Sequence, residues 1–134
     1  MDKKDERVFV KDIKGQLMQP GDRVIRGNTK DRALFFIISG KFFTQDDTSY
    51  PEHGPVYKTG SVLGVDQFLN DDKWAYDLIC YEEGIVAKYE YASYINVKAA
   101  APGVSSKFYN RIIRHKCYEM LEAQKEKKSE YLTD

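Results

Sequence analysis

The stretch that decides the fold of this chain is PGDRVIRGNTKDRALFFIISG, residues 20–40. A turn at Pro20–Asp22 leads into a short apolar strand, Val24–Arg26, and a polar Gly-Asn break follows it. Leu34–Ile38 is a dense apolar run of the length of a buried strand, and it stops at Ser39-Gly40. The stretch therefore predicts two strands of an all-antiparallel sheet, separated by a polar loop.

The same residues resemble the opening strands of the cyclic nucleotide-binding domain family. That family's pattern is Gly-Asp, a short strand with Arg, a loop, and an aromatic-Ile-Ile strand that ends in Gly. Gly21-Asp22, Val24–Arg26, Phe35, Ile37 and Gly40 match it without a gap. Gly60–Gly64 is similar to the family's Gly-x-x-Phe-Gly entry to its phosphate-binding cassette. The resemblance implies a jelly-roll-like roll of about eight strands, then a hinge helix and a helix that closes over the pocket as a lid.

The rest of the chain fits this order of elements. Val56–Lys58 reads as a short strand, and Trp74–Cys80 and Ile85–Tyr91 alternate as paired strands do, with Gly84 available for a turn that needs a positive φ. Gln45–Pro55 is rich in helix and strand breakers and is expected to be a surface loop. The sequence predicts an α+β protein, an antiparallel β-roll followed by C-terminal helices. At 134 residues we expect one domain, with the roll over residues 8–91 and the helices over 92–128.

The predicted helices carry both apolar and basic side chains. Ala92–Ala101 has a helix-compatible composition, and Ser105 is expected to cap a second helix. Apolar residues of that second helix recur at three- and four-residue steps, which predicts one apolar face for core packing or for a partner. The candidates for a lid or a partner contact are Lys107, Arg111, Arg114, Ile112 and Ile113.

The phosphate-binding cassette is where the chain departs from the family. The resemblance implies a Glu after the second Gly for the ribose hydroxyl, and about nine residues later an Arg for the cyclic phosphate. Val65 stands at the first position and Trp74 at the second. An anion that loses a guanidinium partner loses charge-assisted hydrogen bonds worth about 1.5–3 kcal/mol each. The candidate pocket residues are Gly64, Val65, Lys73, Trp74, Ala75 and Tyr76.

Trp74 has two interpretations. As a core residue, it would plug the mouth of the roll and take the place of a nucleotide by packing. As a binding residue, it would stack on a base or on a partner's side chain, a role that Tyr76 would share.

Charge and motifs narrow the function further. The formal net charge is zero, so no overall field attracts nucleic acid, and no apolar run is long enough to insert into a membrane. Between Gln45 and Glu90 there are ten acidic residues and three lysines, which indicates solvated faces or a surface for a charged partner.

His53 and His115 have no ligands at metal-binding spacing, so no metal site is expected, nor the His-rich interior of a cupin enzyme. Cys80 and Cys117 lie among apolar residues, so we expect both to be small, reduced residues of the core. Reduced cysteines indicate an intracellular protein, most simply a cytoplasmic one.

The sequence therefore favours a non-catalytic regulatory or assembly module. We expect it to lack the usual binding of cyclic AMP or cyclic GMP, to need no cofactor, and to act through protein contacts of its terminal helices and the Gln45–Pro55 loop. No effector segment remains once the domain is built, so a parent polypeptide or a protein partner is expected. The alternative is a ligand sensor that binds a cyclic nucleotide or a nucleoside with altered pocket chemistry.

Overall fold

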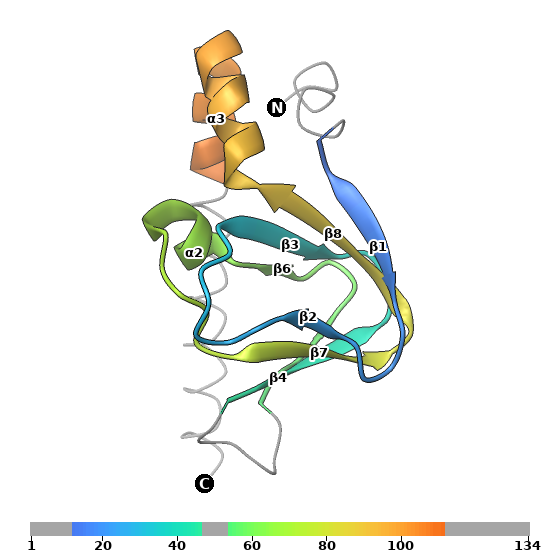
Figure 1. Ribbon diagram of the computed structural model, residues 1–134. Coiled ribbons are helices and arrows are strands. Elements are labelled where there is room, and N and C mark those ends of the chain that lie inside the picture. Colours follow the sequence, from blue (N-terminus) through green and yellow to red (C-terminus); the bar gives the residue numbers. More distant parts are fainter. Residues whose placement is uncertain (1–11, 47–53, 112–134) are drawn as a thin grey trace, which may run out of the picture.

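Two antiparallel sheets form the body of the protein in the computed structural model, which describes residues 12–46 and 54–111 (Figure 1). One sheet has the strand order β1-β8-β3-β6 and the other the order β2-β7-β4-β5. The predicted α+β architecture, a β-roll followed by helices, is confirmed. The strands are β1 (Lys14–Met18), β2 (Arg23–Ile25), β3 (Ala33–Ile37), β4 (Lys41–Gln45), β5 (Val56–Lys58), β6 (Val62–Leu63), β7 (Asp77–Glu82) and β8 (Gly84–Glu90).

Strand β3 consists entirely of apolar residues because both of its faces are covered by other parts of the protein. Successive side chains of a strand point to opposite faces. Phe35 and Ile37 point into the core between the two sheets. Leu34 and Phe36 belong to a second apolar cluster, beneath the helices. Both faces of β3 are thus covered, and each large side chain that is fully buried contributes about 1.5–3 kcal/mol of stabilisation.

Glycines allow the β3–β4 and β7–β8 connections to lie against each other. Gly40 has a φ of 85°, and a Cβ atom there would lie 2.7 Å from the carbonyl oxygen of Glu82 and from the Cα atom of Gly84. Gly84 itself lies against the carbonyl oxygen of Ser39. Its φ is not positive, so it is required for this close approach and not for the turn conformation that the sequence suggested.

The cassette segment contains a helix that the sequence did not predict. Helix α2 (Val65–Asn70) follows β6, and it ends at Asp71, which has a left-handed φ of 56°. Trp74 lies in the segment between α2 and β7, so the predicted strand Trp74–Cys80 begins three residues too early. The reason is that the backbone of Trp74 pairs with Asn28 and Thr29 and not with a neighbouring strand of a sheet.

The C-terminal helices lie at one end of the roll. Helix α3 (Tyr91–Ala100) continues directly from β8 (Figure 1), and residues 102–111 are helical as well. The prediction of Ser105 as the N-cap is wrong, because the helix already begins at Pro102, whose fixed φ suits a first turn. Lys107 and Arg111 lie exposed on this segment, whereas Ile112, Ile113 and Arg114 lie outside the described residues.

None of the helices described in residues 12–46 and 54–111 is long and apolar enough to cross a bilayer.

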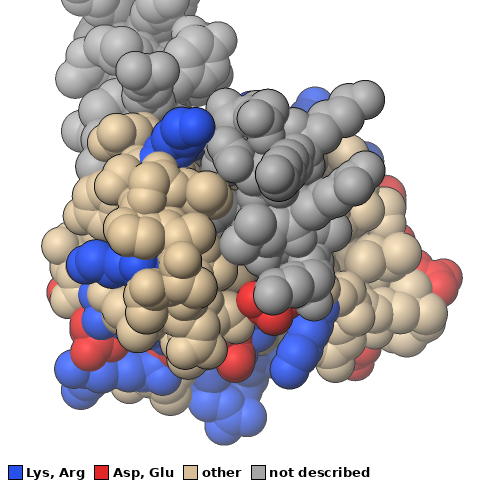
Figure 2. Space-filling model, turned by 90° about the horizontal axis from the view of Figure 1, so that it is seen from above, with Lys and Arg blue, Asp and Glu red and all other residues tan. Residues whose placement is uncertain are grey.

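The end of the molecule at which α3 lies carries charges of both signs (Figure 2). Outside the grey atoms most of this face is neutral, and basic and acidic side chains lie next to one another along its edge.

Candidate functional site

The candidate site is the segment of residues 64–76, which leaves β6, forms α2 and returns to β7. Gly64 is buried at its start, with a φ of 97°. Val65 begins α2, is 3% exposed, and packs in the apolar cluster with Leu34 and Phe68. An apolar side chain in that position offers no hydrogen bond to a ligand hydroxyl.

Trp74 is completely buried and belongs to the core between the two sheets. Its ring meets the ring of Phe35 edge to face, with 5.6 Å between centroids, and that of Tyr76 at 5.9 Å. Such edge-to-face pairs are each worth about 0.5–1.5 kcal/mol beyond the area that they bury. Trp74 is therefore held by aromatic contacts inside the roll.

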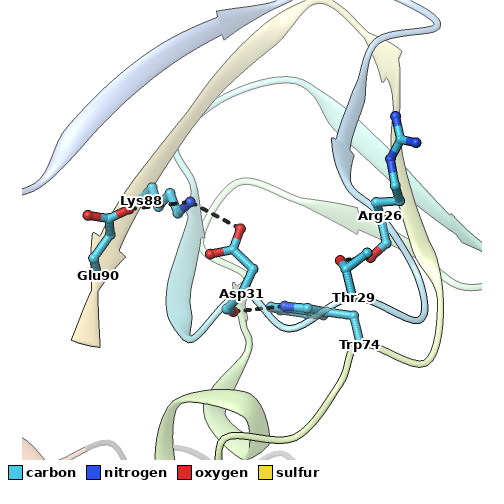
Figure 3. A network of polar contacts seen from close by, with 6 residues as sticks. All are labelled: Arg26, Thr29, Asp31, Trp74, Lys88 and Glu90. Carbon is cyan, nitrogen blue, oxygen red and sulfur yellow. Dashed lines mark hydrogen bonds and ion pairs between the residues drawn. The ribbon is translucent and has the colours of Figure 1, made fainter. Parts of the chain in front are cut away.

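Hydrogen bonds fix both the indole and the backbone of Trp74 (Figure 3). Its Nε1 atom donates to the carbonyl oxygen of Asp31 at 2.9 Å. Its backbone nitrogen donates to the carbonyl oxygen of Thr29 at 3.0 Å, and its own carbonyl accepts from the nitrogen of Asn28 at 2.7 Å. The only polar atom of the indole thus has a partner despite its burial, as a buried donor requires.

Gly64 and Trp74, ten residues apart in the sequence, are in contact in the fold. A Cβ atom at position 64 would lie 2.8 Å from Cη2 of Trp74 and would also meet the carbonyl oxygen of Ala33. Glycine is needed there twice over, for the positive φ and for the space that the indole occupies.

A small charge network lies beside the indole. The Nζ atom of Lys88 lies 3.0 Å from Oδ2 of Asp31 and 3.6 Å from Oε1 of Glu90 (Figure 3). It also lies over the ring of Phe35, 5.6 Å from the centroid. Asp77, at the start of β7, accepts a hydrogen bond from the backbone nitrogen of Gly27 at 2.6 Å. The positive charge of Lys88 is therefore shared between two carboxylates of the protein.

The other predicted pocket residues differ in their burial and contacts. Lys73 and Ala75 are exposed on either side of Trp74, and Tyr76 is half-buried against it. The structure thus brings together Gly64, Trp74 and Tyr76 from the predicted set, whereas the side chain of Val65 lies in a separate apolar cluster.

Sequence reasoning missed the loop residues Asp31 and Arg32. Asp31 supplies the carbonyl to which the indole donates, and Arg32 donates from Nε to the carbonyl oxygen of Phe68 at 2.9 Å and from Nη2 to that of Leu69 at 3.2 Å. Arg32 thereby caps α2, whose own last turn contains no basic residue. The polar loop was visible in the sequence, but its partners lie more than 35 residues away.

Three buried groups have altered acidities. Burial, helped by the charges of Asp22 and Glu83, raises the pKa of the Cys80 thiol. Burial also raises the pKa values of the Tyr89 and Tyr94 hydroxyls. All three groups therefore stay protonated and neutral near neutral pH. Within residues 12–46 and 54–111, no three His, Cys, Asp or Glu side chains are grouped to hold a metal ion; His53, His115 and Cys117 lie outside these residues.

No protein-family model matches the chain, and no curated protein matches it either. Solved structures do. The regulatory subunit of a cAMP-independent protein kinase A from Trypanosoma brucei matches over 92% of this chain and 43% of its own, with 18% identity and a TM-score of 0.66. This chain thus spans less than half of that protein's length.

Two further solved structures match in the same way. A cyclic nucleotide-binding domain from Methylobacillus flagellatus matches over 91% of this chain and 70% of its own, with 10% identity and a TM-score of 0.81. The regulatory domain of Toxoplasma gondii PKA, solved with cAMP, matches over 85% of this chain and 44% of its own, with 14% identity and a TM-score of 0.63. The chain therefore has the fold of the cyclic nucleotide-binding domains, as the resemblance of its opening strands predicted.

Proposed function

We propose that this protein is a non-catalytic regulatory or assembly module that does not bind cyclic AMP or cyclic GMP in the usual way and acts through protein contacts. The observation that carries the proposal is the burial of Trp74, at the position where the family resemblance implies the phosphate-binding Arg. The indole is neutral and packed against Phe35 and Tyr76. It leaves an entering phosphate without a guanidinium partner, and a buried anion is costly without one.

The charges beside Trp74 support the same proposal. Lys88, the cation of the adjacent network, is already paired with Asp31 and Glu90. An incoming phosphate would have to displace these carboxylates or lie close to them, and the like charges would repel each other. Lys73 points away from the core as an exposed side chain, so it is not a replacement for the missing Arg.

The matched structures support a role inside a larger assembly. They are regulatory subunits and binding domains, and the first of them is more than twice as long as the part that this chain matches. We place the module inside the cell, as part of a longer regulatory protein or as a small subunit of a complex. Ile95 and Tyr109 on the terminal helices are exposed and available for such contacts.

The alternative, a sensor that stacks a nucleoside base on Trp74, has less support. A stacking residue must present a ring face to the ligand, and Trp74 has no exposed surface. Binding would require the indole to leave the core, at the expense of its aromatic contacts and its hydrogen bond to Asp31.

Calorimetric titration with cyclic AMP, cyclic GMP, adenosine and guanosine tests the proposal. We expect no saturable heat from any of the four at micromolar concentration. Saturable binding of a cyclic nucleotide would overturn the proposal and identify a second-messenger sensor. Saturable binding of a nucleoside alone would also overturn it, in favour of the altered sensor.

A further inference from the structure

A cavity of about 440 Å³ lies where α2 meets the two helical segments, α3 and residues 102–111. Its wall combines residues of the loop before β3, of α2, and of both helical segments. The cavity is separate from the Trp74 site, because neither Trp74 nor Gly64 lines it. Its volume falls within the range of about 300–1,000 Å³ that is typical of small-molecule sites.

Two charged side chains of the described residues line this junction cavity, and both are basic. Arg32 comes from the roll and Lys98 from α3, and no carboxylate of residues 12–46 or 54–111 lines the wall. Within the part of the chain that the structure describes, neither side chain forms a salt bridge. The cavity thus presents two positive charges that a ligand with a negative group would neutralise.

Arg32 is held in place before any ligand arrives. Two of its nitrogens donate to carbonyl oxygens at the end of α2, and its guanidinium lies 3.4 Å from the centre of the Tyr91 ring. Fixing a long side chain usually opposes binding through lost entropy. Here the protein's own contacts have already ordered it.

Aromatic rings and hydroxyl groups make up much of the remaining wall. The rings of Tyr94 and Tyr109 lie 6.5 Å apart with 29° between their planes, and Tyr109 is 38% exposed. Ser106 and Asn110 add polar groups that can hydrogen-bond. Flat apolar surfaces beside hydrogen-bonding groups suit a planar ring that carries polar substituents.

We propose that the junction cavity binds a small aromatic acid, in which a phosphate or carboxylate group is attached directly to the ring with no sugar between them, unlike in a cyclic nucleotide. The anionic group faces Arg32 and Lys98, and the ring lies against the tyrosines. Such a ligand would connect the end of α2 to the terminal helices, because the two cations belong to opposite sides of the junction. This inference goes beyond the proposed function and does not depend on it, since it concerns a different cavity.

Titration of the full chain with phenyl phosphate and with benzoate, followed by calorimetry and by NMR chemical shifts, tests this site. Inorganic phosphate, which has the anionic group but no ring, and phenol, which has the ring but no anionic group, serve as controls. We expect saturable one-to-one binding of phenyl phosphate, benzoate or both, at least about tenfold tighter than either control, which corresponds to about 1.4 kcal/mol. Which of the two binds more tightly distinguishes a phosphate ligand from a carboxylate ligand.

Two variants then locate the binding. Lys98→Gln removes an exposed cation and Tyr109→Ala removes a partly exposed ring, so both should fold, as circular dichroism would verify. We expect each to weaken binding at least about fivefold, while Lys58→Gln, also at an exposed position but on β5 and outside the cavity wall, leaves it unchanged. The proposal is overturned if neither probe saturates below about 10 mM, if inorganic phosphate binds as well as phenyl phosphate, or if Lys98→Gln and Tyr109→Ala bind unchanged.

Discussion

The inside of the roll and the junction beneath the helices are both rich in aromatic rings, but they use them differently. Inside the roll, Trp74 and Phe35 pack with aliphatic side chains, and the one indole nitrogen is hydrogen-bonded to the protein. At the junction, Phe68 contacts several tyrosines, and a cavity with two cations remains beside them. The comparison teaches that aromatic rings leave no exposed surface on Trp74 inside the roll, whereas at the junction they leave open space beside two cations.

The largest effect is expected from Trp74→Ala, which empties the centre of the roll. Loss of a fully buried tryptophan lowers the free energy of unfolding by about 3–5 kcal/mol, because contacts are lost and a cavity remains. Urea denaturation followed by circular dichroism measures the change, and Trp74→Phe, which keeps an aromatic ring, should lose less. A loss below about 1 kcal/mol would mean that Trp74 serves binding and not packing.

Gly64→Ala is expected to have the next largest effect. A non-glycine residue with a positive φ costs about 1–3 kcal/mol, and here the new methyl group also collides with the indole of Trp74. Gly60→Ala is the matched control, since Gly60 has nearly the same φ of 94° and nothing within 4 Å of its added Cβ. Urea denaturation of both should show the larger loss at Gly64. Equal losses would contradict the contact between Gly64 and Trp74.

The strands of this fold could be predicted from the sequence better than its site. Val24–Arg26 and Leu34–Ile38 carry enough apolar residues to identify strands at nearly their observed bounds. Helix α2 has only six residues, too few to show a helical period, so the apolar stretch from Ser61 to Leu69 gave no signal for it.

The contacts of the site were beyond the reach of sequence reasoning for a different reason. Trp74 was identified at the Arg position, but its hydrogen bond to Asp31 joins residues 43 positions apart. Arg32, Lys98 and Tyr109 form one cavity although they are spread over most of the chain. Contacts of this kind depend on how the sheets and helices pack, and local sequence patterns do not predict this packing.

A smaller effect is expected at the junction, from Arg32→Lys. Lysine keeps the charge but lacks the planar fork that donates to both Phe68 and Leu69, so α2 loses part of its cap. Because Arg32 is only half-buried, we expect a loss of about 1–2 kcal/mol in unfolding free energy. Thermal and urea unfolding measure it, with Lys58→Arg, at an exposed position on β5 in the other sheet, as a control. No change would show that α2 does not depend on this cap.

The smallest effect concerns the response of stability to high pH. Burial raises the pKa of Tyr89 above the ordinary value of 10.0, so the folded state favours the neutral hydroxyl. That contribution is complete below the unfolded pKa and is lost as pH rises above it. Unfolding free energy should therefore fall above about pH 10, and fall less steeply in Tyr89→Phe. Identical pH profiles in the two proteins would remove Tyr89 as the cause.

The fluorescence of Trp74 tests the central claim most directly, because it is the only tryptophan in the chain. If the indole fills the roll, its emission is shifted to the blue of free tryptophan. Acrylamide quenches it far less than in the urea-unfolded protein, and neither cyclic nucleotides nor nucleosides change it. Red-shifted emission that acrylamide quenches readily, or that changes saturably with a nucleotide, would contradict the account and return Trp74 to the role of a ligand-binding residue.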